Sequence, residues 1–167
     1  MSRRALLEGL ALGAGAAAAG AAVWPLAAGA LDPLIGAAPP VEAPWIEVAG
    51  EKEIRDGTLF KATLRVPVRD GFFTTIVDLG AVWLMRSADG RLAALSATCP
   101  HLGCGIGPDA KGGFVCPCHD SRFSADGSYE HGPSPRGMDP LPVRVEQGRV
   151  LVQALRFTIG TRERRQI

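Results

Sequence analysis

The chain has 167 residues, of which 47% are hydrophobic, and it carries 18 Lys and Arg against 17 Asp and Glu. A chain of this length forms one domain with a short appendage. Arg3, Arg4 and Glu8 are the charged residues of the first 31, so the rest of the chain carries 16 basic and 16 acidic residues. This balance gives no indication of a nucleic acid or another polyanion as partner.

The N-terminal segment has the pattern of an export signal and a membrane anchor. Arg3 and Arg4 precede 23 residues without a charge, Gly9 to Leu31. As a helix this run would be about 35 Å long, and a bilayer core is about 30 Å thick. The stretch "SRRALL" resembles a twin-arginine signal. We expect residues 1–31 to be retained as a transmembrane helix, although Ala28-Gly29-Ala30 also fits a cleavage site.

Residues 32–45 predict an extended hinge linker, because they hold four prolines and show no periodicity. Beyond them no run has helical periodicity, and short apolar or alternating runs are separated by turn signals. We therefore predict a small all-β domain over residues 46–157, followed by a basic tail at 158–167 that is a solvated end. The predicted strands are 58–68, 73–79, 81–87, 91–97, 113–117, 141–146 and 149–155, with Trp83 and Met85 as core residues.

All four cysteines and two of the three histidines lie in two short loops, "CPHLGC" at 99–104 and "CPCHDSRF" at 116–123. A zinc site, two disulfides or an iron–sulfur cluster could use these groups. Structural zinc fingers usually take two cysteines from one knuckle and two histidines from another, whereas each loop here mixes the two. Two disulfides would leave both histidines without a role. A two-iron cluster with two Cys on one iron and two His on the other uses four of the six groups.

The two loops resemble the cluster-binding boxes of Rieske [2Fe–2S] proteins, in the disulfide-bearing form found in cytochrome bc complexes. The stretch "GPSPRGMDPLPV" at 132–143 resembles the proline-rich loop of the same family. The resemblance implies an all-β Rieske domain with its cluster loops at one tip. It implies cluster ligands at Cys99, His101, Cys116 and His119, a disulfide between Cys104 and Cys118, and further cluster-facing residues at Leu102, Ser121, Phe123 and Pro133.

The function implied by the resemblance is that of the iron–sulfur subunit of a membrane quinol–cytochrome c oxidoreductase, a translocase. The protein would take an electron and a proton from quinol and pass the electron to a c-type cytochrome, with cytochrome b as a further subunit. His119 is the expected proton acceptor and His101 the alternative, because reduction of a cluster raises the pKa of its imidazole ligands. The expected location is the bacterial cytoplasmic membrane, with the N-terminus in the cytoplasm and the Rieske domain in the periplasm.

Two residues near the last histidine depart from the best-known respiratory pattern. Phe123 stands where that pattern has a tyrosine, and Asp120 adds a negative charge, whereas Ser121 keeps a hydroxyl that can donate to a cluster sulfur. Both departures disfavour the reduced cluster. A low-potential quinol such as menaquinol is therefore an expected donor.

Three other functions fit parts of the pattern. The small Rieske subunit of a periplasmic molybdenum oxidase, such as arsenite oxidase, would share the export signal and the missing tyrosine. A soluble Rieske ferredoxin of a ring-hydroxylating oxygenase is disfavoured by the disulfide pair and the export signal. A structural zinc module would carry no electrons. His131 is expected to be an ordinary surface residue.

Overall fold

The computed structural model describes residues 42–87 and 89–167. Over this part of the chain it contains eleven β-strands, one 3-10 turn at Glu51–Glu53 and no α-helix, so the prediction of an all-β domain is confirmed. The transmembrane helix predicted at residues 1–31 lies outside the described residues. Within them, no helix has the length and apolar character needed to cross a bilayer.

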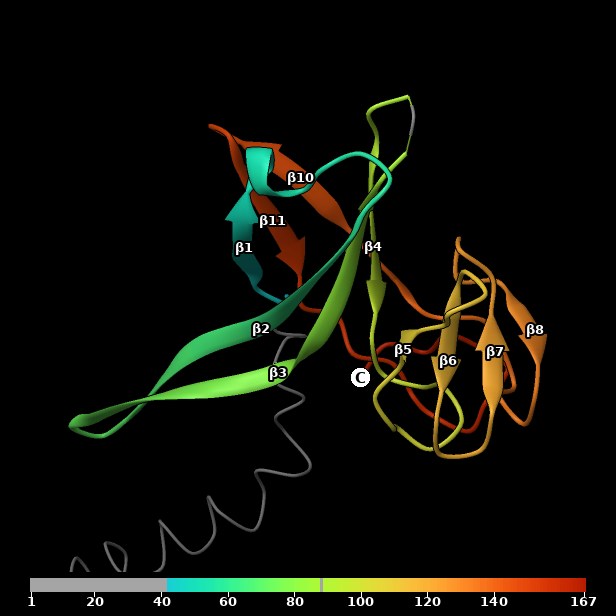
Figure 1. The fold of residues 1–167 in the computed structure, drawn as a ribbon. Helices are drawn as coiled ribbons and strands as arrows, with labels where there is room; N and C mark the ends of the chain where they lie inside the picture. Colours follow the sequence, from blue (N-terminus) through green and yellow to red (C-terminus); the bar gives the residue numbers. More distant parts are fainter. Residues whose placement is uncertain (1–41, 88) are drawn as a thin grey trace, which may run out of the picture. The chain divides into compact units, whose positions relative to one another are not determined.

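The strands form three antiparallel sheets (Figure 1). The first has the order β1 (Trp45–Gly50), β11 (Arg149–Gln153) and β10 (Val143–Glu146). The second has the order β2 (Leu59–Asp70), β3 (Phe73–Arg86), β4 (Leu92–Ser96) and β9 (Pro140–Leu141). The third has the order β5 (Gly107–Pro108), β6 (Phe114–Cys116), β7 (Ser121–Phe123) and β8 (Tyr129–His131).

Strand β3 connects two hydrophobic cores because successive side chains of a strand point to opposite faces. Val82 and Leu84 are fully buried in a core shared with the first sheet, which contributes Val150 and Val152. Trp83 points to the other face and packs in a second core under the third sheet. The two faces of one strand therefore fix the third sheet against the rest of the domain.

The second core supports the two cysteine-containing loops. Its members include Phe114, Phe123 and the side chains of Cys99 and Cys116. The indole nitrogen of Trp83 donates a hydrogen bond of 2.9 Å to the Ile106 carbonyl, just beyond the first loop. Trp83 is thus a core residue, as predicted, and it also ties the loop to β3.

The predicted strands 73–79 and 81–87 form one continuous strand. Gly80 pairs with Leu64, whereas Asp78 pairs with Arg65, so Leu79 is an extra residue on β3. Gly80 has a φ of 125°, a conformation that glycine adopts readily. It therefore forms a β-bulge, where the strand bends but continues.

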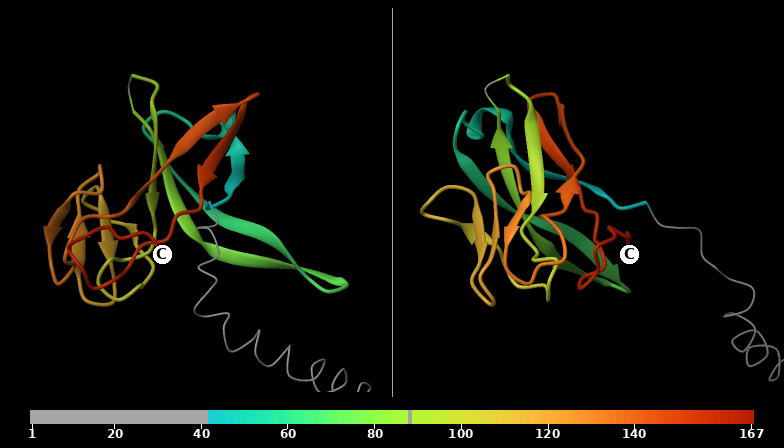
Figure 2. Two further views of the ribbon diagram at one scale, coloured as in Figure 1. Left: turned by 180° about the vertical axis from the view of Figure 1, so that it is seen from behind. Right: turned by 90° about the vertical axis from the view of Figure 1, so that its right-hand side faces the viewer.

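Strands β2 and β3 extend well beyond β4, their neighbour in the second sheet. β4 pairs only with Val82–Arg86 of β3, so residues 65–78 form a two-stranded ribbon with no third strand. The ribbon protrudes from the domain in Figure 1 and in the left-hand view of Figure 2.

Candidate metal centre

The first loop leaves β4 and closes on itself. The amide of Cys99 donates to the Cys104 carbonyl at 2.8 Å, and the amide of Gly103 donates to the Cys99 carbonyl at 2.9 Å. The second loop is the turn between β6 and β7, where Cys116 pairs with Ser121. Both loops are therefore held by backbone hydrogen bonds that do not depend on a metal.

Cys104 and Cys118 form a disulfide between the two loops, with their Cα atoms 6.6 Å apart. The predicted disulfide is confirmed. The remaining two cysteines of the described residues, Cys99 and Cys116, are free and buried. The four thiols thus divide into one oxidised pair and one reduced pair.

The reduced pair has the properties of metal ligands in a dry site. Cys99 and Cys116 are 1% and 2% exposed. The pKa of the Cys99 thiol is raised to about 11, first by burial and then by the neighbouring Cys116 thiol. Because only a thiolate binds metal, loading this site releases protons.

The two loop histidines lie together. The ring centroids of His101 and His119 are 4.9 Å apart, with the rings nearly perpendicular. His101 is half-buried and His119 is exposed. The structure therefore groups the predicted ligands in two pairs: Cys99 with Cys116 as buried thiols, and His101 with His119 as more exposed imidazoles.

This donor set fits a two-iron cluster better than a single ion. The Cys116 sulfur lies within 4.8 Å of the Cys104 and Cys118 sulfurs, but those two are joined in the disulfide and cannot ligate as thiolates. A mononuclear zinc site needs four ligands around one point, whereas a Rieske centre takes two Cys on one iron and two His on the other. Separate pairs of thiols and imidazoles match the second arrangement.

The proline-rich loop at 132–143 packs directly on the second cysteine loop, at the start of β7. Ser121 is fully buried, and its Oγ accepts a hydrogen bond of 3.1 Å from the Ser134 amide. Gly132 has a φ of 97°, and a Cβ there would lie 2.6 Å from the Ser121 Cα. Only glycine permits this approach. Pro133, between them, is exposed.

Phe123 and Leu102 differ in their surroundings. Phe123 is 1% exposed and packs in the core that contains both free cysteines. Leu102 is 59% exposed at the tip of the first loop. Phe123 is thus a neighbour of the thiol pair, whereas Leu102 is available to a partner.

Asp120 shares its ion-pair partner with a second carboxylate. Its carboxylate pairs with Arg122 at 2.8 Å, and Arg122 also pairs with Asp109. One guanidinium thus faces two carboxylates, so the three side chains keep one net negative charge, and the effect of Asp120 on the cluster stays a prediction. His131 is exposed on β8, where it pairs with Arg122 in the sheet register.

The basic tail is exposed at nearly every residue, and hydrogen bonds also hold it against the domain. Arg136 of the proline-rich loop forms a buried ion pair with Asp139, with two contacts of 2.8 Å. The same guanidinium donates to the carbonyls of Thr158 and Thr161. Arg164 of the tail reaches Asp139 at 3.1 Å.

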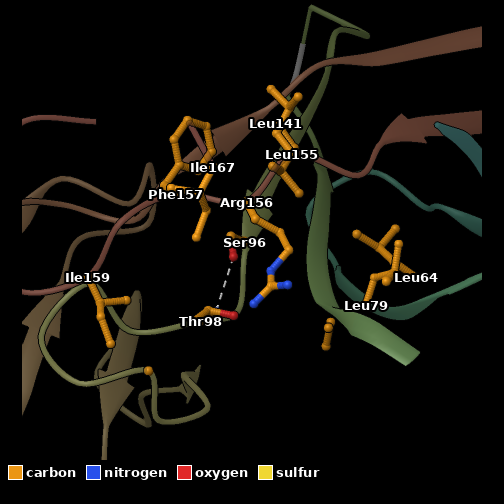
Figure 3. A pocket seen from close by; sticks show the side chains of 13 residues that line it. Leu64, Leu79, Ser96, Thr98, Leu141, Leu155, Arg156, Phe157, Ile159 and Ile167 are labelled. Atoms are coloured by element: carbon orange, nitrogen blue, oxygen red, sulfur yellow. Dashed lines mark hydrogen bonds between the residues drawn. The ribbon is translucent and has the colours of Figure 1, made fainter. Parts of the chain in front are cut away.

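The tail also contacts the first cysteine loop. The amide of Gly160 donates to the Pro100 carbonyl at 2.7 Å. A pocket of about 320 Å³ lies beside that loop, where Ile159 and Ile167 of the tail face Thr98 and Gly103 (Figure 3). Sequence reasoning missed this support; the only local signal was an Arg and an Asp three residues apart in the proline-rich loop.

An iron–sulfur electron-transport domain is the class of protein that this fold and donor set define. The sequence model of the Rieske [2Fe-2S] domain matches residues 44–147, and the chain belongs to this family. Its cofactor is one [2Fe–2S] cluster.

Known relatives place the domain in different contexts. The chain is 31% identical over 161 residues to the cytochrome b6-f complex iron-sulfur subunit of Gloeobacter violaceus, covering 91% of this chain and 82% of that protein. It is 40% identical over 88 residues to the carotenoid phi-ring synthase of Chlorobaculum tepidum, covering 52% of this chain and only 13% of the length of that protein. The plasma membrane Rieske protein of Synechocystis PCC 6803 is 29% identical, with a TM-score of 0.41 over 55% of this chain and 85% of that one.

Proposed function

We propose that this chain is the iron–sulfur subunit of a membrane quinol–cytochrome c oxidoreductase of the cytochrome bc or b6-f type. The similarity to the Gloeobacter violaceus subunit carries this proposal, because it extends over 91% of the chain. An alignment of that extent reaches beyond the Rieske domain into the N-terminal apolar segment. A similarity confined to the Rieske domain would not indicate which proteins this chain works with.

The proposed ligands are Cys99 and Cys116 on one iron and His101 and His119 on the other. The burial of the thiols and the 4.9 Å separation of the imidazole centroids support this assignment. When bound, the cluster supplies a one-electron couple. The disulfide between Cys104 and Cys118 keeps the two loops together whether or not the cluster is present.

His119 is the proposed proton acceptor because it is the more exposed of the two imidazoles. As a cluster ligand, His119 would keep one ring nitrogen free, and this nitrogen would accept the hydroxyl proton of a quinol. Leu102, 59% exposed in the adjacent loop, is proposed to contact the quinol site. Proton and electron then leave the quinol at one place.

Ser121 and Phe123 set the proposed redox range. The Ser121 oxygen accepts from the Ser134 amide, so its hydroxyl proton is left to donate to a cluster sulfur. Phe123 has no such proton to offer. With one donor where relatives of the best-known pattern have two, the reduced state is less stabilised, and menaquinol is the proposed donor.

The proposed topology follows from the N-terminus. Residues 1–31 anchor the chain in the bacterial cytoplasmic membrane, residues 32–45 form a hinge, and the Rieske domain faces the periplasm. A cytochrome b and a c-type cytochrome are the proposed partners.

Purification from membranes tests the proposal. The chain carrying a C-terminal affinity tag should remain in the membrane fraction after carbonate washing and should co-purify with a b-type cytochrome. The complex should reduce cytochrome c with menaquinol, and a His119→Gln variant should lose this activity, whereas His131→Gln should keep it. Co-purification with a large molybdopterin subunit would overturn the proposal in favour of a periplasmic oxidase.

A further inference from the structure

The β2–β3 ribbon exposes an unusual amount of apolar surface at its end. Phe72 is 98% exposed and Phe73 is 78% exposed, at the turn that joins the two strands. Ile76 is 60% exposed and Val68 is 45% exposed on the strands behind them. Side chains this exposed bury little apolar area within the domain, so their place at a projecting tip favours a contact outside it.

The register divides the ribbon into two faces. Val66 pairs with Val77, Val68 with Thr75 and Asp70 with Phe73, so these side chains share one face, which is largely apolar. The other face carries Pro67 opposite Ile76, and beside them the ion pair between Arg65 and Asp78, which are 3.0 Å apart and more than half exposed. A two-stranded ribbon without a covered face is marginal in water.

The chain enters the domain beside this ribbon. Residues Pro44–Glu47 and Arg65–Pro67 line the same shallow pocket. The uncharged run ends at Leu31, and the eleven residues 32–42 that follow it can extend about 34 Å. The free part of the ribbon, from Arg65 to Asp70, spans about 17 Å. The tether is therefore long enough to let the tip reach the bilayer that holds the anchor.

In Figure 1 the ribbon tip and the turn between β6 and β7 both lie at the lower edge of the domain, at opposite ends of it. That turn carries His119. An orientation that brings His119 toward a membrane-embedded quinol site also brings the ribbon tip toward the membrane.

We propose that Phe72 and Phe73 insert into the interfacial layer of the bilayer that carries the anchor, as a second, reversible membrane contact. The inference rests on the anchoring proposed above. Lipid fits this tip because the two side chains are apolar and Arg69 and Asp70 beside them balance in charge, so the tip has no charge pattern that would select a protein surface. A tether raises the local concentration of lipid around the tip, so that a small apolar contact is sufficient for reversible binding to the membrane.

Photocrosslinking of the full chain with its cluster tests this inference. The photoreactive residue p-benzoylphenylalanine replaces Phe72, and the protein is reconstituted into vesicles of phosphatidylcholine and phosphatidylglycerol in equal parts. A matched control carries the same residue at Leu59, which is 42% exposed at the opposite end of β2. Irradiation should give lipid adducts at position 72, detected by mass spectrometry, and none at position 59.

A second substitution separates insertion from mere proximity. Phe73→Asp in the position-72 protein should abolish the lipid adduct, whereas Val145→Asp, at an exposed apolar position on β10, should leave it unchanged. The visible spectrum of the cluster reports that each variant is folded.

The outcomes distinguish this inference from the anchoring. Failure of the protein to float with the vesicles would overturn the anchoring and the insertion together. Flotation without an adduct at position 72 would overturn the insertion alone. An adduct between two copies of the chain would assign the tip to self-association, and an adduct to another subunit in native membranes would assign it to a protein partner.

Discussion

Replacement of Arg136 by alanine tests whether the proline-rich loop and the C-terminal tail support the cluster site. The Arg136 and Asp139 side chains are only 6% and 7% exposed. The substitution removes both hydrogen bonds to Asp139 and both donors to the carbonyls of Thr158 and Thr161. Those carbonyls position the tail segment whose Gly160 amide bonds to the first cysteine loop.

The expected loss of stability follows from the burial of the pair. Removing one partner of a buried ion pair costs about 3–5 kcal/mol. Arg164 still reaches Asp139 at 3.1 Å, so the carboxylate keeps one cation and the lower end of that range applies. In a domain of this size about 3 kcal/mol lowers Tm by about 10–15 °C.

Thermal unfolding of the full chain with its cluster, followed by circular dichroism at a fixed scan rate, measures this effect. Arg149→Ala is the matched control, because its ion pair with Glu47 is more than half exposed and contributes about 0–1 kcal/mol. The Arg136→Ala protein should also lose its visible absorbance faster at a fixed temperature. Equal melting temperatures and equal rates of cluster loss in the two variants would refute the reasoning.

Three further substitutions probe the site and its turns. Phe123→Tyr should raise the reduction potential by roughly 40 mV in protein-film voltammetry, if about 1 kcal/mol of a hydrogen bond to the thiolates is specific to the reduced state; an unchanged potential with an intact cluster would contradict this. Gly132→Ala should destabilise the domain more than Gly148→Ala in urea unfolding, because both positions have positive φ but only the first meets backbone atoms; equal losses would remove the clash argument. Asp126→Asn should lower Tm at neutral pH, because hydrogen bonds from Ser124 and Ser128 hold the pKa of this carboxyl below its ordinary value of 3.8. A carboxyl whose pKa is lowered by folding stabilises the fold at pH values above its unfolded-state pKa, and this stabilisation is lost as the pH falls through the folded-state pKa. The two proteins should therefore have the same Tm in acid. A difference in Tm that persists in acid would show another cause.

The chemistry of the site could be predicted from the sequence because it depends on short spacings. The loops at 99–104 and 116–123 each contain a cysteine, a histidine and a second cysteine, and the structure brings the two loops together through the predicted disulfide. Strands with alternating or apolar character, such as β2 and β11, were also predictable.

Features that depend on contacts between distant residues could not be predicted. Strands β7 and β8 have three residues each, which is too short for a periodicity to show, and they form only because the sheet provides partners. The pairing of Arg164 with Asp139 spans 25 residues. Nothing near the tail in the sequence indicates this contact, and the run of arginines predicts only an exposed end. The sharing of Arg122 between Asp109 and Asp120 depends on how the third sheet brings the three side chains together.

Pulsed EPR of the reduced protein carrying ¹⁵N-labelled histidine tests the ligand assignment most directly. The assignment of His101 and His119 predicts two strongly coupled nitrogens on the cluster. One coupling should disappear in His101→Cys and one in His119→Cys, and both should persist in His131→Gln. A cluster without nitrogen couplings, or a His119→Cys variant that retains both, would contradict the account of the site.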